Sequence, residues 1–189
     1  AFGGAQFDPP WDGAGGLWKI PVDSLDALAS GKTASKMPEF LAIPGNPDGV
    51  EVSPIDGMVY VNTVGPVAGA PDPANGGIYA ISDMKTLPAP IDHNLGALDG
   101  LDFTTQGTMV NTQIRADMPV GLYVNCIGKE AAALELVPNV ELSGPADIAI
   151  RQMDDGSYMI VVPELSARDN TPGDDDVTVL VVASTFDCR

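Results

Sequence analysis

The chain has 189 residues, 44% of them hydrophobic, and its 26 acidic and 9 basic residues give a formal net charge of −17 at pH 7. This length suits one well-buried domain. The shortage of Lys and Arg argues against nucleic acid and against a membrane surface as partners, because phosphate groups are bound by basic side chains. No apolar run approaches the roughly 18 residues that a membrane span needs.

The N-terminal part predicts an arm followed by strands. Residues 1–15 are rich in Gly, Pro and Asp and predict an irregular arm, whereas residues 16–189 predict a single domain. Within that domain, a first strand is expected at 16–21, a short helical turn at 24–29 and a second strand at 40–43.

Three stretches that begin with Asp organise the rest of the chain. Residues 47–53 (PDGVEVS) are echoed by residues 98–104 (LDGLDFT) and more loosely by residues 146–150 (ADIAI). Each predicts a strand, then a glycine turn eight or nine residues after the Asp, then a second strand. The three Asp residues are 51 and then 48 residues apart, a period in the range of one β-propeller blade. The expected turn residues are Gly57, Gly107 and Gly156.

A second repeated feature is Gly followed by an aliphatic and an aromatic residue. It occurs at 16–18, 77–79 and 121–123, in phase with the Asp-led stretches, and predicts the third strand of each repeat. Weaker outer strands are expected at 90–95 and 132–137. The last strand, at 177–183, is almost continuously apolar, which predicts burial on both faces.

The pattern therefore predicts an all-β fold, a β-propeller with about three to four blades in this chain. Propellers usually close with four to eight blades, and unpaired strand edges promote aggregation, so some form of closure is expected. Three forms are open. Two copies can close one ring as a homodimer, a different second chain can complete the ring, or the repeats can form a compact four-bladed ring.

In such a fold, the first strand of each blade lines a central channel. Asp48, Asp99 and Asp147 are then expected to converge near one mouth of the channel. A set of oxygen ligands favours Ca²⁺, with Mg²⁺ or another divalent cation as the alternative. A different interpretation is that these Asp residues cap turns and accept hydrogen bonds from backbone amides. Glu51 and Asp102 are expected either to support the metal site as neighbouring polar groups or simply to form the polar faces of the hairpins.

The stretches 47–53 and 98–103 resemble the gluconolactonase and senescence-marker-protein family of calcium-dependent six-bladed propellers. Strictosidine-synthase and paraoxonase relatives are more distantly similar. The resemblance covers roughly residues 44–164. It implies that Asp99 binds the metal and serves as the general base in lactone hydrolysis, and that Asp48 stands where the family has a metal-binding Asn. The family's N-terminal Glu ligand has no counterpart in this sequence.

Two functions follow as hypotheses. The first is a calcium-dependent lactonase or ester hydrolase that acts on a small-molecule lactone or ester. The second is a non-catalytic propeller subunit for binding or assembly, with a structural ion in its channel. A Ser/His/Asp triad is not expected, because His93 is the only histidine and no Gly-x-Ser-x-Gly motif is present.

The two cysteines, Cys126 and Cys188, predict a disulfide that ties the end of the chain to the third-repeat region. On the chain-entropy model this crosslink contributes roughly 4 kcal/mol. Two unrelated thiols are the alternative. The disulfide in turn predicts a periplasmic or extracellular location.

Overall fold

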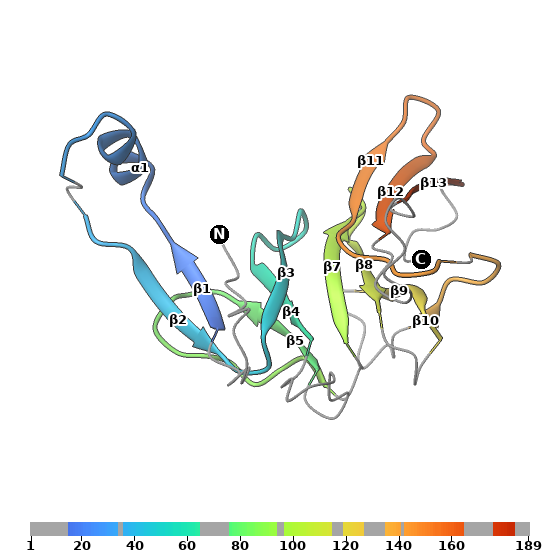
Figure 1. Cartoon of the computed structure of the whole chain (residues 1–189), viewed down its shortest axis with the longest axis horizontal. Helices are drawn as coiled ribbons and strands as arrows, with labels where there is room; N and C mark the ends of the chain where they lie inside the picture. The colour runs from blue at the N-terminus through green and yellow to red at the C-terminus, as the bar shows by residue number, and fades with distance from the viewer. Residues whose placement is uncertain are drawn as a thin grey trace.

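The computed structural model describes residues 15–33, 36–64, 76–93, 97–114, 119–126, 135–140, 142–164 and 176–183. In this part of the chain, strands form four small antiparallel sheets, and α1 (Val22–Ala29) connects the first two strands (Figure 1).

We number the sheets in chain order. The first sheet contains β1 (Gly15–Lys19) and β2 (Glu39–Ile43), and the second contains β3 (Pro47–Val52), β4 (Val59–Thr63), β5 (Gly77–Ile81) and β6 (Asp92–His93). The third sheet contains β7 (Leu98–Phe103), β8 (Thr108–Gln113), β9 (Gly121–Cys126) and β10 (Glu135–Leu136), and the fourth contains β11 (Ala149–Gln152), β12 (Tyr158–Glu164) and β13 (Asp176–Val182).

The glycine turns predicted after each Asp-led stretch are confirmed. Gly57, Gly107 and Gly156 have φ values of 70°, 88° and 83°, in the left-handed region that side chains disfavour. Each ends a hairpin turn between the first and second strand of a sheet, namely β3–β4, β7–β8 and β11–β12. The repeated sequence pattern therefore corresponds to a repeated hairpin.

Other strand predictions are confirmed with shifted boundaries. The second and third sheets follow the expected order, each strand pairing with the next along the chain. The outer strands β6 and β10 each contain two described residues, and parts of the predicted ranges 90–95 and 132–137 lie outside the described residues. In the third repeat the strand begins at Ala149, so Asp147 precedes β11 instead of lying within it. The helical turn is a full two-turn helix, α1.

The sheets pack face to face in chain order, and three hydrophobic clusters hold them together. The first cluster joins the first and second sheets through Leu17, Ile43 and Val61. Along β4 and β5 the side chains alternate between the two faces of the second sheet. Tyr60 and Ile78 therefore face the third sheet, in the second cluster. The third cluster lies between the third and fourth sheets and includes Val110, Leu122, Ile148, Ile160 and Val162.

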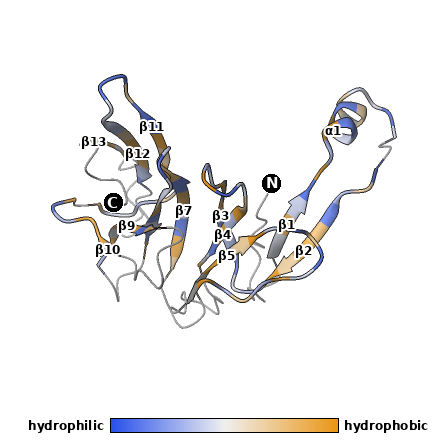
Figure 2. Cartoon of the chain, turned by 180° about the vertical axis from the view of Figure 1, so that it is seen from behind, coloured by the Kyte–Doolittle hydropathy of each residue, from blue (hydrophilic) through white to orange (hydrophobic). Residues whose placement is uncertain are grey.

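The first strands of successive sheets are neighbours, since β3 lies against β7 and β7 lies against β11. The sheets fan out from these strands, with the first and fourth sheets at opposite ends of the array (Figure 1). The turn between β11 and β12 is hydrophilic, whereas hydrophobic residues concentrate on the strands (Figure 2).

The prediction that the last strand is buried on both faces is wrong. In β13, Val177, Val179 and Val181 are exposed, while Leu180 and Val182 pack into the third cluster. The reason is the position of the fourth sheet at the end of the array. No other sheet of the described residues covers its outer face.

Several expectations concern residues that the structure does not describe. The N-terminal arm, apart from its last residue, lies outside the described residues. Cys188 also lies outside the described residues, so its disulfide with Cys126 stays a prediction. Among the helices of the described residues, none is long and apolar enough to cross a membrane.

Candidate functional site

The candidate site is built by the Asp-Gly pairs at the starts of β3 and β7. A Cβ atom placed on Gly49 would lie 2.6 Å from the backbone oxygen of Asp99, and one on Gly100 would lie 2.7 Å from Cα of Asp147. Real Cβ contacts are not this short, so each glycine lets the next Asp segment approach the strand closely. The small residue after each Asp thus brings Asp48, Asp99 and Asp147 into one region of the molecule.

The proximity of these carboxylates is visible in their electrostatics. Partial burial, followed by the charge of Asp147, raises the pKa of Asp48 to about 6. Burial also raises the pKa of Asp99 to about 7, and the charges of Asp48 and Asp147 add to the effect. Asp48 still reaches solvent and loses less of its hydration than the half-buried Asp99. No basic side chain contributes to either shift, so the negative charge is not compensated within the described part of the chain.

Asp147 also has a local role. Its Oδ1 atom accepts a hydrogen bond of 2.8 Å from the backbone amide of Ile148. This is the backbone-capping role that was the alternative to metal binding. The structure therefore brings all three predicted residues together and gives one of them a structural contact as well.

Two buried amides hold the strands that carry the aspartates. The Oδ1 atom of Asn62 accepts a 2.8 Å hydrogen bond from the amide of Gly49, and its Nδ2 atom donates to the carbonyl of Gly100 at 3.0 Å. The same Nδ2 atom donates to Oδ1 of Asn111 at 3.1 Å. Asn62 therefore connects the second and third sheets directly behind Asp48 and Asp99.

Thr112 performs the equivalent task one sheet further on. The amide of Gly100 donates to its hydroxyl oxygen at 2.6 Å, and the hydroxyl donates to the carbonyl of Ala146. The backbone before Asp147 is thereby fixed against β7. The sequence repeat indicated neither this threonine nor its role, because the corresponding hydrogen bond in the second sheet is made by Asn62.

Asp102, on β7, lies beside this site and acts as a link between sheets. It accepts hydrogen bonds of 2.6 Å from the amides of Phe103 and Ile150. Burial nevertheless raises its pKa, and the charges of Glu51 and Asp147 add to the increase. Glu51 accepts a hydrogen bond from the next amide, Val52, at 2.9 Å. Asp102 therefore links β7 to β11, and its role as a supporting group of the site stays a prediction.

Glu164 is a buried carboxylate that sequence reasoning missed. Its Oε2 atom accepts hydrogen bonds from the amide and the hydroxyl of Ser143, and Oε1 accepts one from Thr178. Burial alone would raise its pKa, but these hydrogen bonds outweigh burial and lower it. Because residues 143–146 lead into Asp147, Glu164 fixes the approach of the third aspartate. No motif marks it, since its partners are distant in sequence.

The donor chemistry of the three aspartates suits a hard cation such as Ca²⁺. However, the described residues contain no group of three or more His, Cys, Asp or Glu side chains that could hold a metal ion. The carboxylates are close enough to repel one another but are not placed as a finished ligand set. Metal binding therefore stays a prediction and would require them to draw together.

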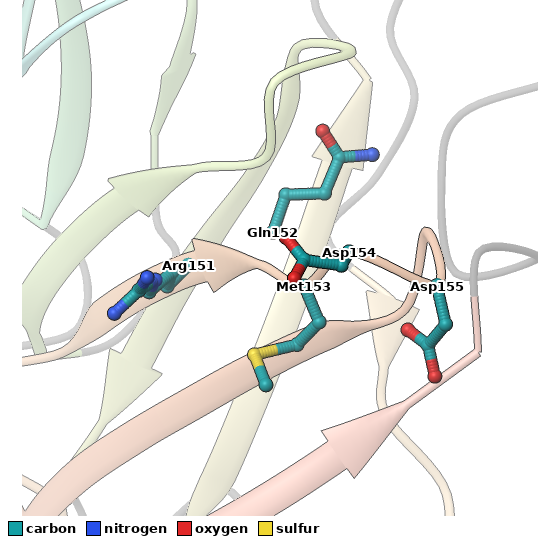
Figure 3. A pocket seen from close by; sticks show the side chains of 5 residues that line it. All are labelled: Arg151, Gln152, Met153, Asp154 and Asp155. Atoms are coloured by element: carbon teal, nitrogen blue, oxygen red, sulfur yellow. The ribbon is translucent and has the colours of Figure 1, made fainter.

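A surface pocket lies elsewhere, at the turn between β11 and β12. Figure 3 shows its lining side chains, which point in different directions around the hairpin and do not converge on one point. The turn is at the opposite end of β11 from Asp147. The pocket therefore does not belong to the aspartate site. It is lined by Arg151, Gln152, Met153, Asp154 and Asp155.

Comparison with known proteins finds no matching family model, no matching curated protein and no matching solved structure. The function must therefore be argued from the geometry of the chain.

Proposed function

We propose that the four sheets are blades of a β-propeller, and that the chain is a calcium-dependent lactonase-like or ester-hydrolase-like protein whose site contains Asp48, Asp99 and Asp147. Successive sheets stacked through both faces, with neighbouring first strands, support the propeller architecture. The similarity of the Asp-led stretches to the gluconolactonase family supports the reaction class.

One observation carries the proposal. Asp99 is a half-buried carboxylate beside two other carboxylates, with its pKa raised to about 7 and no basic partner contributing. Perturbed groups of this kind concentrate at functional sites, and uncompensated neighbouring carboxylates favour binding of a proton or a cation. In the proposed reaction, Asp99 accepts a proton from the water that attacks the lactone or ester carbonyl.

The three aspartates would hold the cation, which when bound polarises the carbonyl and lowers the pKa of water. The three aspartates also repel one another electrostatically. Three close carboxylates repel one another unless protons or a cation compensate them, since two charges about 5 Å apart repel by roughly 3 kcal/mol at an effective dielectric constant of 20. Asn62 and Thr112 keep the strands in place against this repulsion.

The second candidate is a non-catalytic subunit for binding or assembly. The exposed apolar face of the fourth sheet favours it, because such faces mark interaction surfaces. In that case the three aspartates would bind an ion that only stabilises the channel.

A calcium titration followed by thermal melting tests both candidates. At about 100 times the dissociation constant, a ligand that binds only the folded state adds about 2.7 kcal/mol, or roughly 5–10 °C for a chain of this size. We expect this gain in the wild type and in the exposed control Asp83→Asn, and its loss in Asp99→Asn. Absence of any calcium effect in the wild type contradicts the metal site.

Hydrolysis of a simple δ-lactone then separates the two candidates. The hydrolase proposal expects a calcium-dependent activity that falls by about 100-fold or more in Asp99→Asn, while Asp83→Asn keeps it. Calcium stabilisation without any hydrolysis, or with equal hydrolysis in Asp99→Asn, would favour the non-catalytic subunit.

A further inference from the structure

The outer face of the fourth sheet is apolar across all three strands. The register places Val161 between Ala149 and Val179, and Met159 between Arg151 and Val181. By this register, no acidic side chain of β11, β12 or β13 lies on this face, although the chain has 26 acidic residues. The one charged residue is Arg151, at its end. Apolar residues with Met and Arg, and few carboxylates, are typical of the core of a protein interface.

The outer face of the first sheet is also apolar. The register of β1 and β2 pairs Trp18 with Phe40 and Gly16 with Ala42, and these four residues carry no charge. The rings of Trp18 and Phe40 contact each other at an interplanar angle of 40° with centroids 4.6 Å apart, and both remain exposed. In this acidic chain, each end of the array of sheets thus presents an apolar face to solvent.

The two end faces are opposite halves of one kind of contact. We call the face of a sheet that is directed toward the next sheet in chain order its forward face, and the opposite face its rear face. In each of the three hydrophobic clusters, the forward face of one sheet packs on the rear face of the next. The exposed face of the fourth sheet is a forward face, because its rear face, with Ile160 and Val162, packs on the third sheet. The exposed face of the first sheet is a rear face, because Leu17 and Leu41 point forward to the second sheet. Within one chain the two cannot meet, since they lie at opposite ends of the array (Figures 1 and 2).

We propose that a second copy of this chain covers both faces. The fourth sheet of each copy packs on the first sheet of its partner, head to tail. Two such contacts related by a twofold rotation close one ring, with four sheets from each copy. A head-to-tail contact gives a closed assembly only if the rotation closes, and otherwise gives an open chain of copies. This proposal does not depend on the aspartate site.

The first test is the mass of the intact chain in solution, by light scattering during size-exclusion chromatography. The chain has a mass of 19.6 kDa, so a closed dimer is expected at twice this value, independent of protein concentration. A 19.6 kDa monomer overturns the proposal. A mass that exceeds the dimer and rises with concentration overturns the closed ring.

Substitutions on the two faces test the surfaces. Val181→Lys on β13 and Trp18→Lys on β1 should each give a folded monomer. Val22→Lys on α1 is the matched control, because Val22 is 70% exposed and Val181 is 71% exposed. It should remain dimeric. A dimer that persists in Val181→Lys or Trp18→Lys, or that is lost in Val22→Lys, contradicts the proposed surfaces, and circular dichroism confirms that each variant keeps its strands.

Mixing the two face variants tests the head-to-tail geometry. In a mixed pair, the intact first sheet of Val181→Lys can meet the intact fourth sheet of Trp18→Lys, which restores one of the two contacts. We therefore expect dimer to return on mixing, although neither variant forms it alone. If the fourth sheets paired with each other instead, Trp18→Lys would stay dimeric alone, and the proposal would be wrong.

Discussion

Asp99 stands out among the described acidic residues because its pKa is raised to about 7. The exposed Asp83 has a lowered pKa, since the backbone amides of Lys85 and Thr86 donate hydrogen bonds to it. Asp99 experiences the opposite effect, because burial and two neighbouring carboxylates raise its pKa. The same residue type is therefore stabilised as an anion at one position and destabilised at another. Such a difference is what distinguishes a candidate functional group from a solvated one.

The raised pKa of Asp99 predicts a specific pH dependence of stability. Its value of about 7 lies above the usual Asp pKa of 3.8, so ionisation costs more in the folded state than in the unfolded state. This penalty is fully present above about pH 7 and is relieved as the pH falls toward 3.8. Asp99→Asn removes the penalty. We expect it to raise the free energy of unfolding by about 2 kcal/mol at pH 8 and by much less at pH 5, less than the full shift implies because Asp99 retains some solvent contact.

Urea unfolding at pH 8 and pH 5 without added calcium measures this effect. Asp83→Asn is the control, because its carboxylate is stabilised in the folded protein and its removal should give no gain at pH 8. Equal effects of Asp99→Asn at the two pH values would show that Asp99 is not destabilised by its surroundings.

At the scale of elements, the glycines after Asp48 and Asp99 determine how closely the strands approach. A Cβ on Gly100 would meet three backbone atoms at 2.7 Å, the Cα and C atoms of Asp147 and the N atom of Ile148. These backbone atoms cannot shift aside as easily as the end of a flexible side chain can. The third repeat has Ile148 where the first two have glycine, and Ile148 is buried in the third cluster. The close approach therefore occurs twice in the described chain, between β3 and β7 and between β7 and the segment before β11.

Gly100→Ala is expected to destabilise the protein by about 1–3 kcal/mol, the usual cost of forcing extra atoms into a packed site. Gly121→Ala is the matched control, because its Cβ would meet only the end of the Leu136 side chain, at 3.0 Å. Urea unfolding of both variants gives the difference. Similar losses in the two variants would contradict a specific backbone contact at Gly100.

The strands were largely predictable because the repeat combines apolar alternation with glycine turns. Gly57 and Gly107 show a local signal, since a turn with positive φ demands glycine wherever it lies in the fold. The approach of Asp48 to Asp99 was also predictable in outline from their equivalent positions. The features that were not predicted depend on residues that are distant in the sequence. The alternation in β13 cannot reveal that Val179 lacks a covering sheet, and nothing near Glu164 indicates its hydrogen bonds to Ser143 and Thr178.

At the scale of the whole molecule, each of the three hydrophobic clusters joins two sheets that are neighbours in sequence order. The second and third sheets are covered on both faces, whereas the first and fourth are covered on one. Stability in such an array should be graded, because local opening is easiest where few buried contacts hold a strand. The middle strands β4 and β8 should therefore be the last to open, and β1 and β13 the first.

Hydrogen exchange measured by mass spectrometry can test this gradient and the proposed dimer together. In the monomeric Val181→Lys variant, the amides of β1 and β13 should exchange about tenfold or more faster than those of β4 and β8. In the wild type, the partner's sheets cover both ends, so the gradient should be much smaller, and it should stay small in Val22→Lys. Equal protection of all four strands in Val181→Lys would show that the end sheets are stabilised by contacts within one chain. The exposed valines of β13 would then no longer require a partner.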